Sequence, residues 1–329
     1  MKKLINHTDD VLAESLDGFA VAHADIGTLG AERKFVQRKA HKPGKVALIS
    51  GGGSGHEPLH AGFVGHGMLD AACPGQVFTS PTPDQMLAAA EAVDGGAGTL
   101  FIVKNYSGDM MNFQMAAEML TSDNATVIVN DDVAVENSTY TTGRRGVAGT
   151  LVVEKIVGAA AERGDSLVAL KALGDSVNKA TASMGVALTS CTVPAAGKPT
   201  FQIGNDEMEM GVGIHGEPGR RRVKLGSADE IAGELVGSIL KDLSLARGQE
   251  TILLVNGFGG TPMLELYLMV TAAHKVLAGA GIKVARHLTG SYVTSLEMAG
   301  CSISVTAVDA ASLVLWDAPV HTAALRWGM

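Results

Sequence analysis

The chain has 329 residues, a length that suits two domains of roughly 100–200 residues each. Hydrophobic residues make up 46% of it and aromatic residues only 4%, so we expect a sizeable core built from aliphatic and methionine side chains. The formal net charge is −8. A field of this sign repels phosphate backbones and anionic lipids, so neither a nucleic acid nor a membrane is an expected partner.

Cysteine usage and the N-terminal segment both indicate a cytoplasmic protein. The 3 cysteines, Cys73, Cys191 and Cys301, are odd in number and far apart, which argues against a disulfide framework and favours a reducing compartment. The lysines after Met1 are followed by polar residues rather than by the apolar segment of a secretion signal. No run of about 18 apolar residues is present that could span a bilayer. We therefore expect a soluble, cytoplasmic protein.

Helical and strand patterns alternate along the chain. Apolar residues from Val11 to Ala20 predict a first helix, and an apolar strand over 46–49 ends in glycines. Thr82–Gln85 has the residues of a capping box with a proline in the first turn, so a helix is expected to begin there. Further on we expect helices over 110–120, 147–161, 229–240 and 262–278, and strands over 99–103, 126–129, 186–189, 252–255, 284–288 and 303–308. The methionines at positions 110, 111, 115 and 119 are interpreted as core filling.

This alternation predicts the fold class. Strands that alternate with helices favour α/β architecture, with mainly parallel or mixed sheets covered by helices. We expect two α/β domains of comparable size, over residues 1–183 and 184–329. In such folds ligands bind at the carboxyl ends of the strands, so the loops that follow the strands are the places to look for a site.

Three of these loops follow strands of the first half, and a fourth belongs to the second half. Gly51–Glu57 is rich in glycine, which lets backbone N–H groups approach a ligand, and His56 is expected at a helix N-terminus. Lys104–Asp109 supplies a cation and a carboxylate. Asn130–Asp132 could hold Mg²⁺, but paired aspartates more often cap a loop, and we favour that interpretation. In Met210–Gly219, a single histidine, His215, stands between glycines, so a functional and a structural role are both open.

Short motifs elsewhere do not support other activities. His56–His60 spells HExxH, but Pro58 and the glycines before His56 disfavour the helix that a zinc site of this kind needs. We therefore expect no metal, and a zinc hydrolase is a distant alternative. Gly211–Gly216 matches GxGxxG, yet Pro218 and three arginines follow where a dinucleotide site needs a helix. No P-loop motif is present.

The chain resembles the substrate-binding subunit of dihydroxyacetone (glycerone) kinases over almost its whole length. The segments that carry the resemblance are Lys45–Pro58, Ala72–Gly75, Phe78–Asp84, Lys104–Asp109, Asp131–Val135, Thr189–Ala195, Glu207–Gly219 and Leu315–Thr322. The resemblance implies a phosphotransferase subunit of glycerol metabolism that binds a small ketone where its two domains meet. The type implied is the phosphocarrier-dependent one, in which this chain is a separate subunit.

The resemblance also implies roles for particular residues. His215 matches the histidine that binds the ketone covalently as a hemiaminal. Substrate contacts fall on Gly53, Ser54, Gly55, His56, Lys104, Asp109 and His215. Asp109 is expected to act as the general base on the substrate hydroxyl, with His56 assisting proton transfer and Lys104 steadying the charge.

The partners that the resemblance implies are dihydroxyacetone, a nucleotide-binding kinase subunit L, possibly a phosphocarrier subunit M, and a second copy of the chain in a homodimer. No cofactor is expected in this chain, and ADP or ATP with Mg²⁺ is expected on the partner subunit. Two alternatives stay open: a non-catalytic ketone-sensing regulatory protein, and a kinase subunit for a larger ketose such as erythrulose.

Overall fold

The computed structural model describes residues 2–135, 138, 140–217 and 219–329, so Pro218 lies outside the described residues. The first half of the chain forms a six-stranded sheet in the order β1-β2-β5-β3-β6-β7. Its strands are β1 (Gly27–Leu29), β2 (Val36–Arg38), β3 (Ala47–Ser54), β5 (Ala71–Val77), β6 (Thr99–Lys104) and β7 (Asn124–Val129). The last four are parallel to one another, and β1 and β2 add an antiparallel edge.

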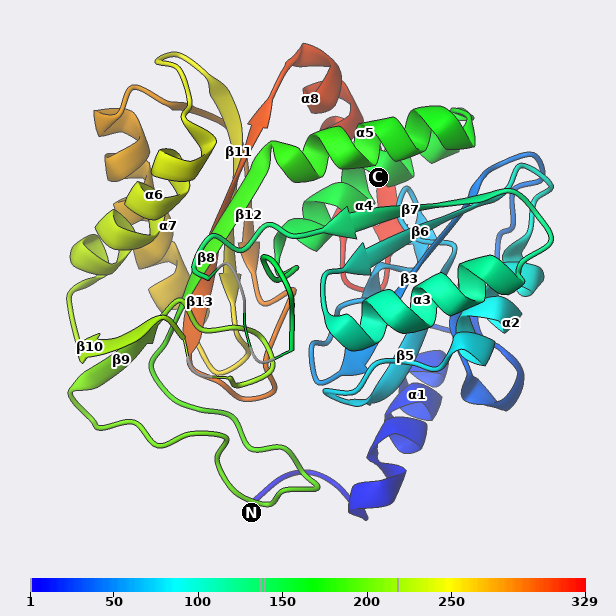
Figure 1. Ribbon diagram of the computed structural model, residues 1–329, viewed down its shortest axis with the longest axis horizontal. Helices are drawn as coiled ribbons and strands as arrows, with labels where there is room; N and C mark the ends of the chain where they lie inside the picture. The colour runs from blue at the N-terminus through cyan, green and yellow to red at the C-terminus, as the bar shows by residue number, and fades with distance from the viewer. Residues whose placement is uncertain (1, 136–137, 139, 218) are drawn as a thin grey trace.

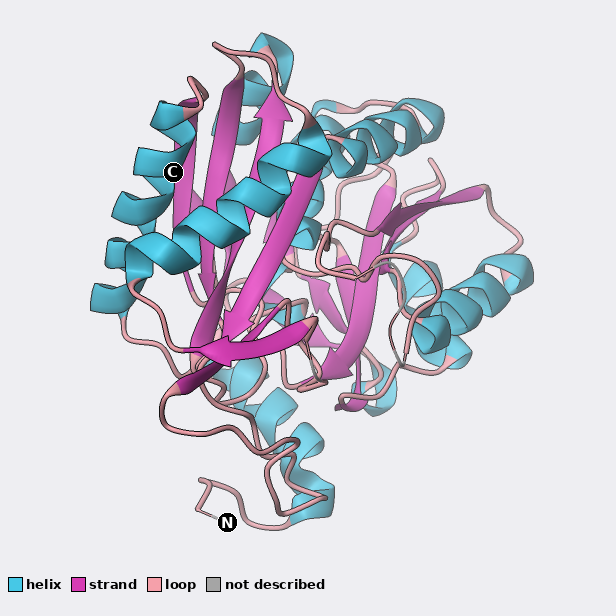
Figure 2. Ribbon diagram, turned by 60° about the vertical axis from the view of Figure 1, so that its left-hand side comes forward, coloured by secondary structure: helices cyan, strands magenta, loops and turns pink. Residues whose placement is uncertain are grey.

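The second half forms another six-stranded sheet, in the order β10-β9-β8-β13-β11-β12. Its strands are β8 (Thr181–Ala187), β9 (Glu207–Met210), β10 (Arg221–Lys224), β11 (Glu250–Gly257), β12 (Lys283–Gly290) and β13 (Gly300–Val308). Only β11 and β12 are parallel, and the other neighbours are antiparallel. The expectation of mainly parallel or mixed sheets is thus met by one largely parallel sheet and one mixed sheet (Figure 2).

Helices cover the outer face of each sheet and fill the space between the sheets (Figure 1). The outer helices are α2 (Pro83–Val93) and α3 (Ser107–Met119) on the first sheet, and α6 (Ala228–Leu243) and α7 (Met263–Gly279) on the second. The inner helices are α4 (Gly149–Arg163), α5 (Leu167–Lys179) and α8 (Ala310–Asp317). Helix α1 (Val11–Ala22) and three short 3-10 helices (Thr8–Asp10, Ala31–Arg33, Ala61–Phe63) complete the helical elements of the described chain.

The alternation of side chains along a strand explains why both faces of the first sheet are covered. In β6, Phe101 and Val103 pack with the core under α2 and α3, while Leu100 and Ile102 belong to the core shared with α4. Helix α4 is apolar around almost its whole circumference and is buried from Gly149 to Ala161. A helix of that composition is stable only with packing on all sides, and α4 therefore lies between the two halves.

A small third sheet joins the end of the chain to the first half. It contains β4 (Gly65–His66), β14 (Val320–Thr322) and β15 (Arg326–Trp327). His321 of β14 pairs with His66 of β4 in antiparallel register. The end of the chain thus pairs with a strand that lies about 250 residues earlier in the sequence. These two strands belong to the two halves that were expected to form separate domains.

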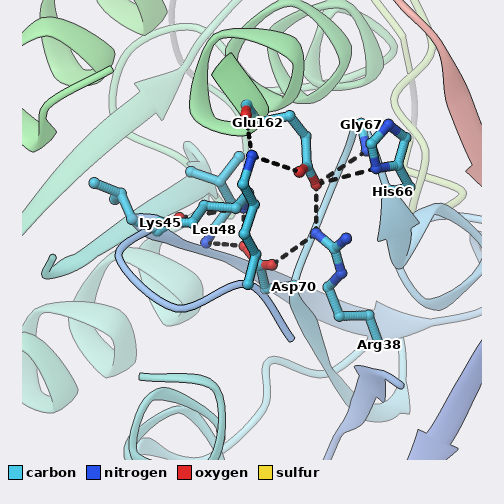
Figure 3. Close-up of polar contacts among 9 residues, drawn as sticks. Arg38, Lys45, Leu48, His66, Gly67, Asp70 and Glu162 are labelled. Carbon is cyan, nitrogen blue, oxygen red and sulfur yellow. Dashed lines mark hydrogen bonds and ion pairs between the residues drawn. The ribbon is translucent and has the colours of Figure 1, made fainter. Parts of the chain in front are cut away.

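Charged side chains at the C-terminal end of α4 fasten this helix to the first sheet (Figure 3). Glu162 accepts hydrogen bonds from Arg38 (2.5 Å) and from the backbone N–H of Gly67 (3.3 Å). Arg38 also donates to Asp70 at 3.1 Å, and Lys45 forms an ion pair with the same aspartate. Two cations and two carboxylates therefore compensate one another in a largely buried cluster.

Several predictions of secondary structure are confirmed and others need correction. The capping box at Thr82 and Gln85 is present at the start of α2. No helix begins at His56, because the chain turns there and continues into a short 3-10 helix at Ala61–Phe63. The expected domain division between residues 183 and 184 falls inside β8, so the two sheets separate earlier, between α5 and Thr181.

The interpretation of the methionines of α3 as core filling is wrong for three of the four. Met111, Met115 and Met119 are 60%, 47% and 56% exposed, because α3 turns Phe113 and Ala116 towards the sheet instead. Met110 alone packs partly against that core. Within the described chain, no helix combines the length and the apolar character that a membrane span requires.

Candidate functional site

A cavity of about 640 Å³ lies where the carboxyl ends of the first sheet face loops of the second half. The first half contributes Gly53 at the end of β3 and Asp109 in the first turn of α3. The second half contributes His215, from the loop between β9 and β10, together with Val193 and Thr200. The expected location at the junction of the two halves is therefore occupied by a cavity of the size that suits a small molecule.

The glycine run forms part of β3 rather than a loop after it. A Cβ atom on Gly51 would lie 2.5 Å from the carbonyl oxygen of Cys73, and one on Gly53 would lie 2.5 Å from the amide nitrogen of Thr79. These two glycines therefore allow β3 to run close to β5 and to the turn that follows β5. Gly53 also reaches the cavity wall.

Of the sequence-predicted contacts, Gly53, Asp109 and His215 line the cavity, whereas Ser54, Gly55, His56 and Lys104 do not. The Ser54 hydroxyl donates a hydrogen bond to the carbonyl oxygen of Gly75 at 2.7 Å. The Gly55 N–H donates to a carboxylate oxygen of Glu57 at 2.9 Å. Neither residue lines the cavity, so their side-chain and amide groups are used to shape the turn.

His56 is buried beside the cavity and presents one free ring nitrogen. Its Nδ1 lies 2.8 Å from the carbonyl oxygen of Thr294, and because a carbonyl only accepts, Nδ1 carries the proton. Burial holds the pKa of His56 well below its ordinary value, and the nearby His215 and Lys104 act in the same direction. Nε2 is thus an unprotonated acceptor, and it has no hydrogen-bond partner among the described residues.

His215 lines the same cavity, and its Nδ1 is buried without a hydrogen-bond partner among the described residues. Its ring centroid lies 4.7 Å from that of His56, 4.5 Å from that of Tyr106 and 5.4 Å from that of Phe78. Burial lowers the pKa of His215 to about 3, and the nearby cations Lys104 and Arg145 act in the same direction. At neutral pH the imidazole is therefore uncharged, which is the form that can act as a nucleophile.

The loop that carries His215 is fastened to the first half through a buried arginine. The His215 N–H donates to Glu217 at 2.9 Å, and the other oxygen of Glu217 accepts from Arg145 at 3.2 Å. Arg145 also donates to Asp132 (2.7 Å) and to the carbonyl oxygen of Gly211 (2.7 Å). Arg145 is fully buried, so its charge is compensated entirely by these partners.

Lys104 and Asp109 form the polar side of the site. Lys104 is buried, with Nζ 3.8 Å from Oδ2 of Asp109. Burial raises the pKa of Asp109, although Lys104 and the hydroxyl of Ser80 partly oppose this effect. Oδ1 of Asp109 has no hydrogen-bond partner among the described residues. A buried carboxylate with a raised pKa and a free oxygen at a cavity wall is suited to accept a proton.

The other motifs of the sequence take structural positions. Asp131 accepts hydrogen bonds from the N–H groups of Val147 and Gly149 at the start of α4, which agrees with the capping interpretation. Residues 211–216 open no helix, as a dinucleotide site would require. Among the described residues there is no cluster of three histidine, cysteine or acidic side chains that could hold a metal ion.

Sequence reasoning missed several residues that complete the site. Phe78, with φ of 55°, stacks on His56 at a centroid distance of 5.1 Å, and no local pattern marks it. Tyr106 was within a candidate loop, but its buried ring against His215 depends on the fold. Arg145 and Glu217 could have been predicted as candidates, because each is a charged residue beside a glycine in a loop that follows a strand.

Comparisons with known proteins agree with this architecture. A model of the Dak1 domain matches residues 17–324. The chain is 49% identical to "PEP-dependent dihydroxyacetone kinase, dihydroxyacetone-binding subunit DhaK" of Escherichia coli, with 100% of both chains covered. It is 51% identical to "PTS-dependent dihydroxyacetone kinase 1, dihydroxyacetone-binding subunit DhaK" of Listeria innocua, over 93% of this chain and 94% of that protein.

A solved structure gives the same picture of the fold. The "dihydroxyacetone kinase operon co-activator Dha-DhaQ" superposes with a TM-score of 0.91 at 33% identity, over 98% of this chain and 99% of the other. The match to the domain model covers nearly the whole sequence, and the two bacterial relatives are similar over nearly their whole length. The chain belongs to the Dak1 domain family.

Proposed function

We propose that this protein is the dihydroxyacetone-binding subunit of a dihydroxyacetone kinase and holds its substrate covalently on His215. The observation that carries the proposal is that an uncharged imidazole and the carboxyl group of Asp109, whose Oδ1 has no partner among the described residues, line one cavity. The names of the two bacterial relatives supply the substrate class. A ketone in this cavity meets a nucleophile on one side and a base on the other.

The covalent step is an addition to the ketone carbon. A ring nitrogen of His215 forms the new C–N bond while the π bond of the carbonyl group opens. The carbonyl oxygen gains a proton and the imidazole loses its N–H proton, so the hemiaminal is neutral. The unprotonated Nε2 of His56 is the group beside His215 that can accept a hydrogen bond from a substrate hydroxyl. A bond to carbon selects ketones over alcohols such as glycerol, which have no carbonyl group.

Phosphoryl transfer then takes place at the hydroxyl group of the anchored substrate. Asp109 accepts the hydroxyl proton as the oxygen attacks phosphorus, and the Lys104 ammonium steadies the negative charge. The phosphoryl group is the terminal one of ATP, which is expected with Mg²⁺ on a separate nucleotide-binding subunit L. ADP is the leaving group, and a phosphocarrier subunit M converts it back to ATP. The chain itself forms a homodimer. These assignments rest on the family resemblance and on the names of the relatives.

The covalent step is tested by intact-protein mass spectrometry of protein that has been mixed with dihydroxyacetone, with no reducing agent added. The expected result is a gain of one triose that maps to the peptide containing His215. His215→Asn should lose the adduct while its thermal unfolding midpoint stays close to that of the parent. An unmodified parent protein, or an adduct on another residue, contradicts the proposal.

The base is tested separately with Asp109→Asn. The amide keeps the shape of the side chain but has no carboxylate to take the proton, so phosphorylation is expected to fall by about 10²–10⁴-fold. The adduct on His215 should still form. Turnover near that of the parent would assign the base to another group, and His56→Asn is the variant to compare next.

The regulatory alternative has one observation in its favour, the close superposition on a co-activator. The higher identity of the kinase subunits, 49% and 51% against 33%, favours the catalytic function. Both proteins could bind a ketone, so adduct formation does not separate them. Production of dihydroxyacetone phosphate after addition of the nucleotide-binding subunit does. A panel that includes erythrulose in the same assay defines the ketose range.

A further inference from the structure

Helix α4 carries a buried carboxylate that the proposed chemistry leaves unexplained. Glu154 has no exposed surface, although the helix around it is apolar. Its charged neighbour in sequence, Lys155, points elsewhere and donates to the backbone carbonyl of Trp316. Burying a carboxylate is unfavourable unless a partner compensates it. The partner of Glu154 is a histidine: Oε1 lies 2.8 Å from Nδ1 of His60.

The hydrogen bonds around His60 fix where its proton lies. The hydroxyl of Ser50 has one hydrogen, and both the carbonyl oxygen of Ile102, at 2.6 Å, and the carboxyl group of Glu154 can accept it. With its hydrogen on either of these groups, Ser50 accepts in its 2.9 Å contact with Nδ1 of His60. Nδ1 thus carries the proton and shares it between Ser50 and Glu154. Burial holds the pKa of His60 well below its ordinary value, with Lys104 and His56 acting in the same direction, so Nε2 is a bare acceptor.

Lys104 is the donor to this acceptor. Its Nζ lies 2.8 Å from Nε2 of His60 and 3.5 Å from the carbonyl oxygen of Gly51. The same ammonium lies 3.8 Å from Oδ2 of Asp109. All four ionisable side chains are buried. A continuous line of contacts therefore runs from Glu154 on α4, through His60 and Lys104, to the carboxylate at the cavity wall.

We propose that His60 and Glu154 are positioning residues that hold Lys104 Nζ in place and prevent it from forming a hydrogen-bonded ion pair with Asp109. The proposal rests on the proposed function, in which Asp109 takes the substrate proton. The ammonium of Lys104 contacts the neutral Nε2 of His60 and the carboxylate of Asp109. Its distance of 3.8 Å from Asp109 is longer than the distance in a hydrogen-bonded ion pair. Asp109 therefore keeps an oxygen free and remains a competent base.

The charges that face Lys104 determine what happens when this hold is removed. The titratable groups are Asp109 on α3 and Glu154 on α4, together with the neutral rings of His60, His56 and His215. Burial raises the pKa of Glu154 to about 8, so Asp109 is the main source of negative charge beside Lys104 at neutral pH. Without an acceptor at Nε2 of His60, the ammonium keeps the carbonyl oxygen of Gly51, at 3.5 Å, and Asp109, at 3.8 Å, as partners, and of these only Asp109 is a carboxyl group. The ion pair then shortens, and a shorter ion pair lowers the pKa of the carboxyl group and weakens it as a base.

Two substitutions of His60 separate positioning from simple packing. In His60→Gln the amide oxygen can take the place of Nε2 and accept from Lys104. In His60→Asn the amide lies near the position of Nδ1, so the contact with Ser50 and Glu154 can be kept but Lys104 loses its acceptor. Each variant leaves one buried group without a partner, so both should lose stability. A difference in rate between them therefore has another cause.

The assay measures phosphorylation of dihydroxyacetone by the full chain together with the nucleotide-binding subunit, as a function of pH. His60→Asn is expected to lower kcat by about 10–100-fold and to move the acidic limb of the pH profile to lower pH. His60→Gln should stay within about threefold of the parent. Glu154→Leu should resemble His60→Asn, and Glu154→Gln, which keeps an acceptor for Nδ1, should resemble His60→Gln. Glu91→Gln, an exposed site on α2, is the control for removal of one carboxylate.

Two further measurements separate this inference from the proposed function. The triose adduct on His215 should form in all His60 and Glu154 variants, because none of them removes the nucleophile. If Asp109→Asn is inactive but His60→Asn and His60→Gln have equal rates and equal pH profiles, the positioning role is wrong and the base assignment stands. If Asp109→Asn is fully active, the base assignment fails and the positioning role fails with it.

Discussion

At the scale of single residues, the site depends on a glycine that makes room for a charge. A Cβ atom on Gly52 would collide with Nζ of Lys104 and would lie 3.5 Å from Nε2 of His60. The ammonium therefore occupies the space that any other residue at this position would fill. The middle of the glycine run in β3 thus serves the arrangement of Lys104, whereas its neighbours serve the packing of β3 on β5.

Gly52→Ala is expected to displace Lys104 and to reduce phosphorylation by roughly 10²-fold, since a shift of about 1 Å in a positioned group has effects of that size. Steady-state kinetics with dihydroxyacetone measures the loss, and circular dichroism checks that the fold remains. Gly233→Ala on α6 is the matched control, because a Cβ there meets nothing within 4 Å. Equal rates for the two variants would show that Lys104 tolerates the methyl group.

Part of the site could be predicted from the sequence, because its residues follow strands. Lys104 and Asp109 stand directly after an apolar strand, and His215 stands between glycines, so these positions were predicted as candidates. The failure at Ser54 has a physical cause: it is still part of β3, and its hydroxyl points to the neighbouring strand. Glu154 and His60 could not be predicted as a pair, since 94 residues separate them.

At the scale of elements, the predictions succeeded where a local signal existed. The capping box of α2 is determined by Thr82 and Gln85, which are three positions apart, and it formed as expected. Strand β5 was not among the expected strands. It contains Pro74, a residue that argues against a central strand, yet it pairs with β3. Whether such a segment forms a strand depends on the strands beside which it lies in the folded chain. The same holds for α3, whose exposed methionines would fit a core equally well.

The ion cluster at the end of α4 makes a prediction about stability and pH. Arg38 holds the pKa of Glu162 below its ordinary value against the opposing effect of burial. A carboxyl group whose pKa is lower in the folded state stabilises the fold above its unfolded-state pKa, and this contribution is lost as the pH falls. Glu162→Gln should therefore lower the free energy of unfolding by about 2 kcal/mol at pH 7.

Chemical denaturation of parent and Glu162→Gln at pH 7 and pH 4 provides the measurement. The difference between the two proteins should shrink at the lower pH, because the parent carboxylate begins to take up a proton there. Activity at pH 7 should change little, since the cluster does not line the cavity. A difference in stability that stays constant between the two pH values would show that packing rather than charge is responsible.

At the scale of the whole molecule, the two halves share a core. Helix α4 is buried from Gly149 to Ala161, and its apolar residues belong to one cluster with residues of both sheets. The cavity is likewise built from both halves. The sequence predicted two domains, but it could not show that one helix would be common to both, because that depends on how the sheets face each other.

We expect that residues 1–180 and 181–329, produced separately, do not fold into stable proteins. Cutting there leaves α4 without one of its two neighbours, and each large aliphatic side chain that becomes exposed loses roughly 1.5–3 kcal/mol from a total stability of about 5–15 kcal/mol. Heteronuclear NMR spectra of the two pieces provide the measurement. Well-dispersed spectra from either piece alone would show that the halves are independent.

The pairing of β14 with β4 bears on the order of events during synthesis. A ribosome releases the first half long before it makes residues 320–322, so β4 must wait without its partner strand while the rest of the chain appears. The small sheet can form only after β14 has been synthesised and has paired with β4. A chain truncated just before β14 should consequently be more open to proteases around residues 65–66 than the full chain, even though it contains every strand of the two large sheets.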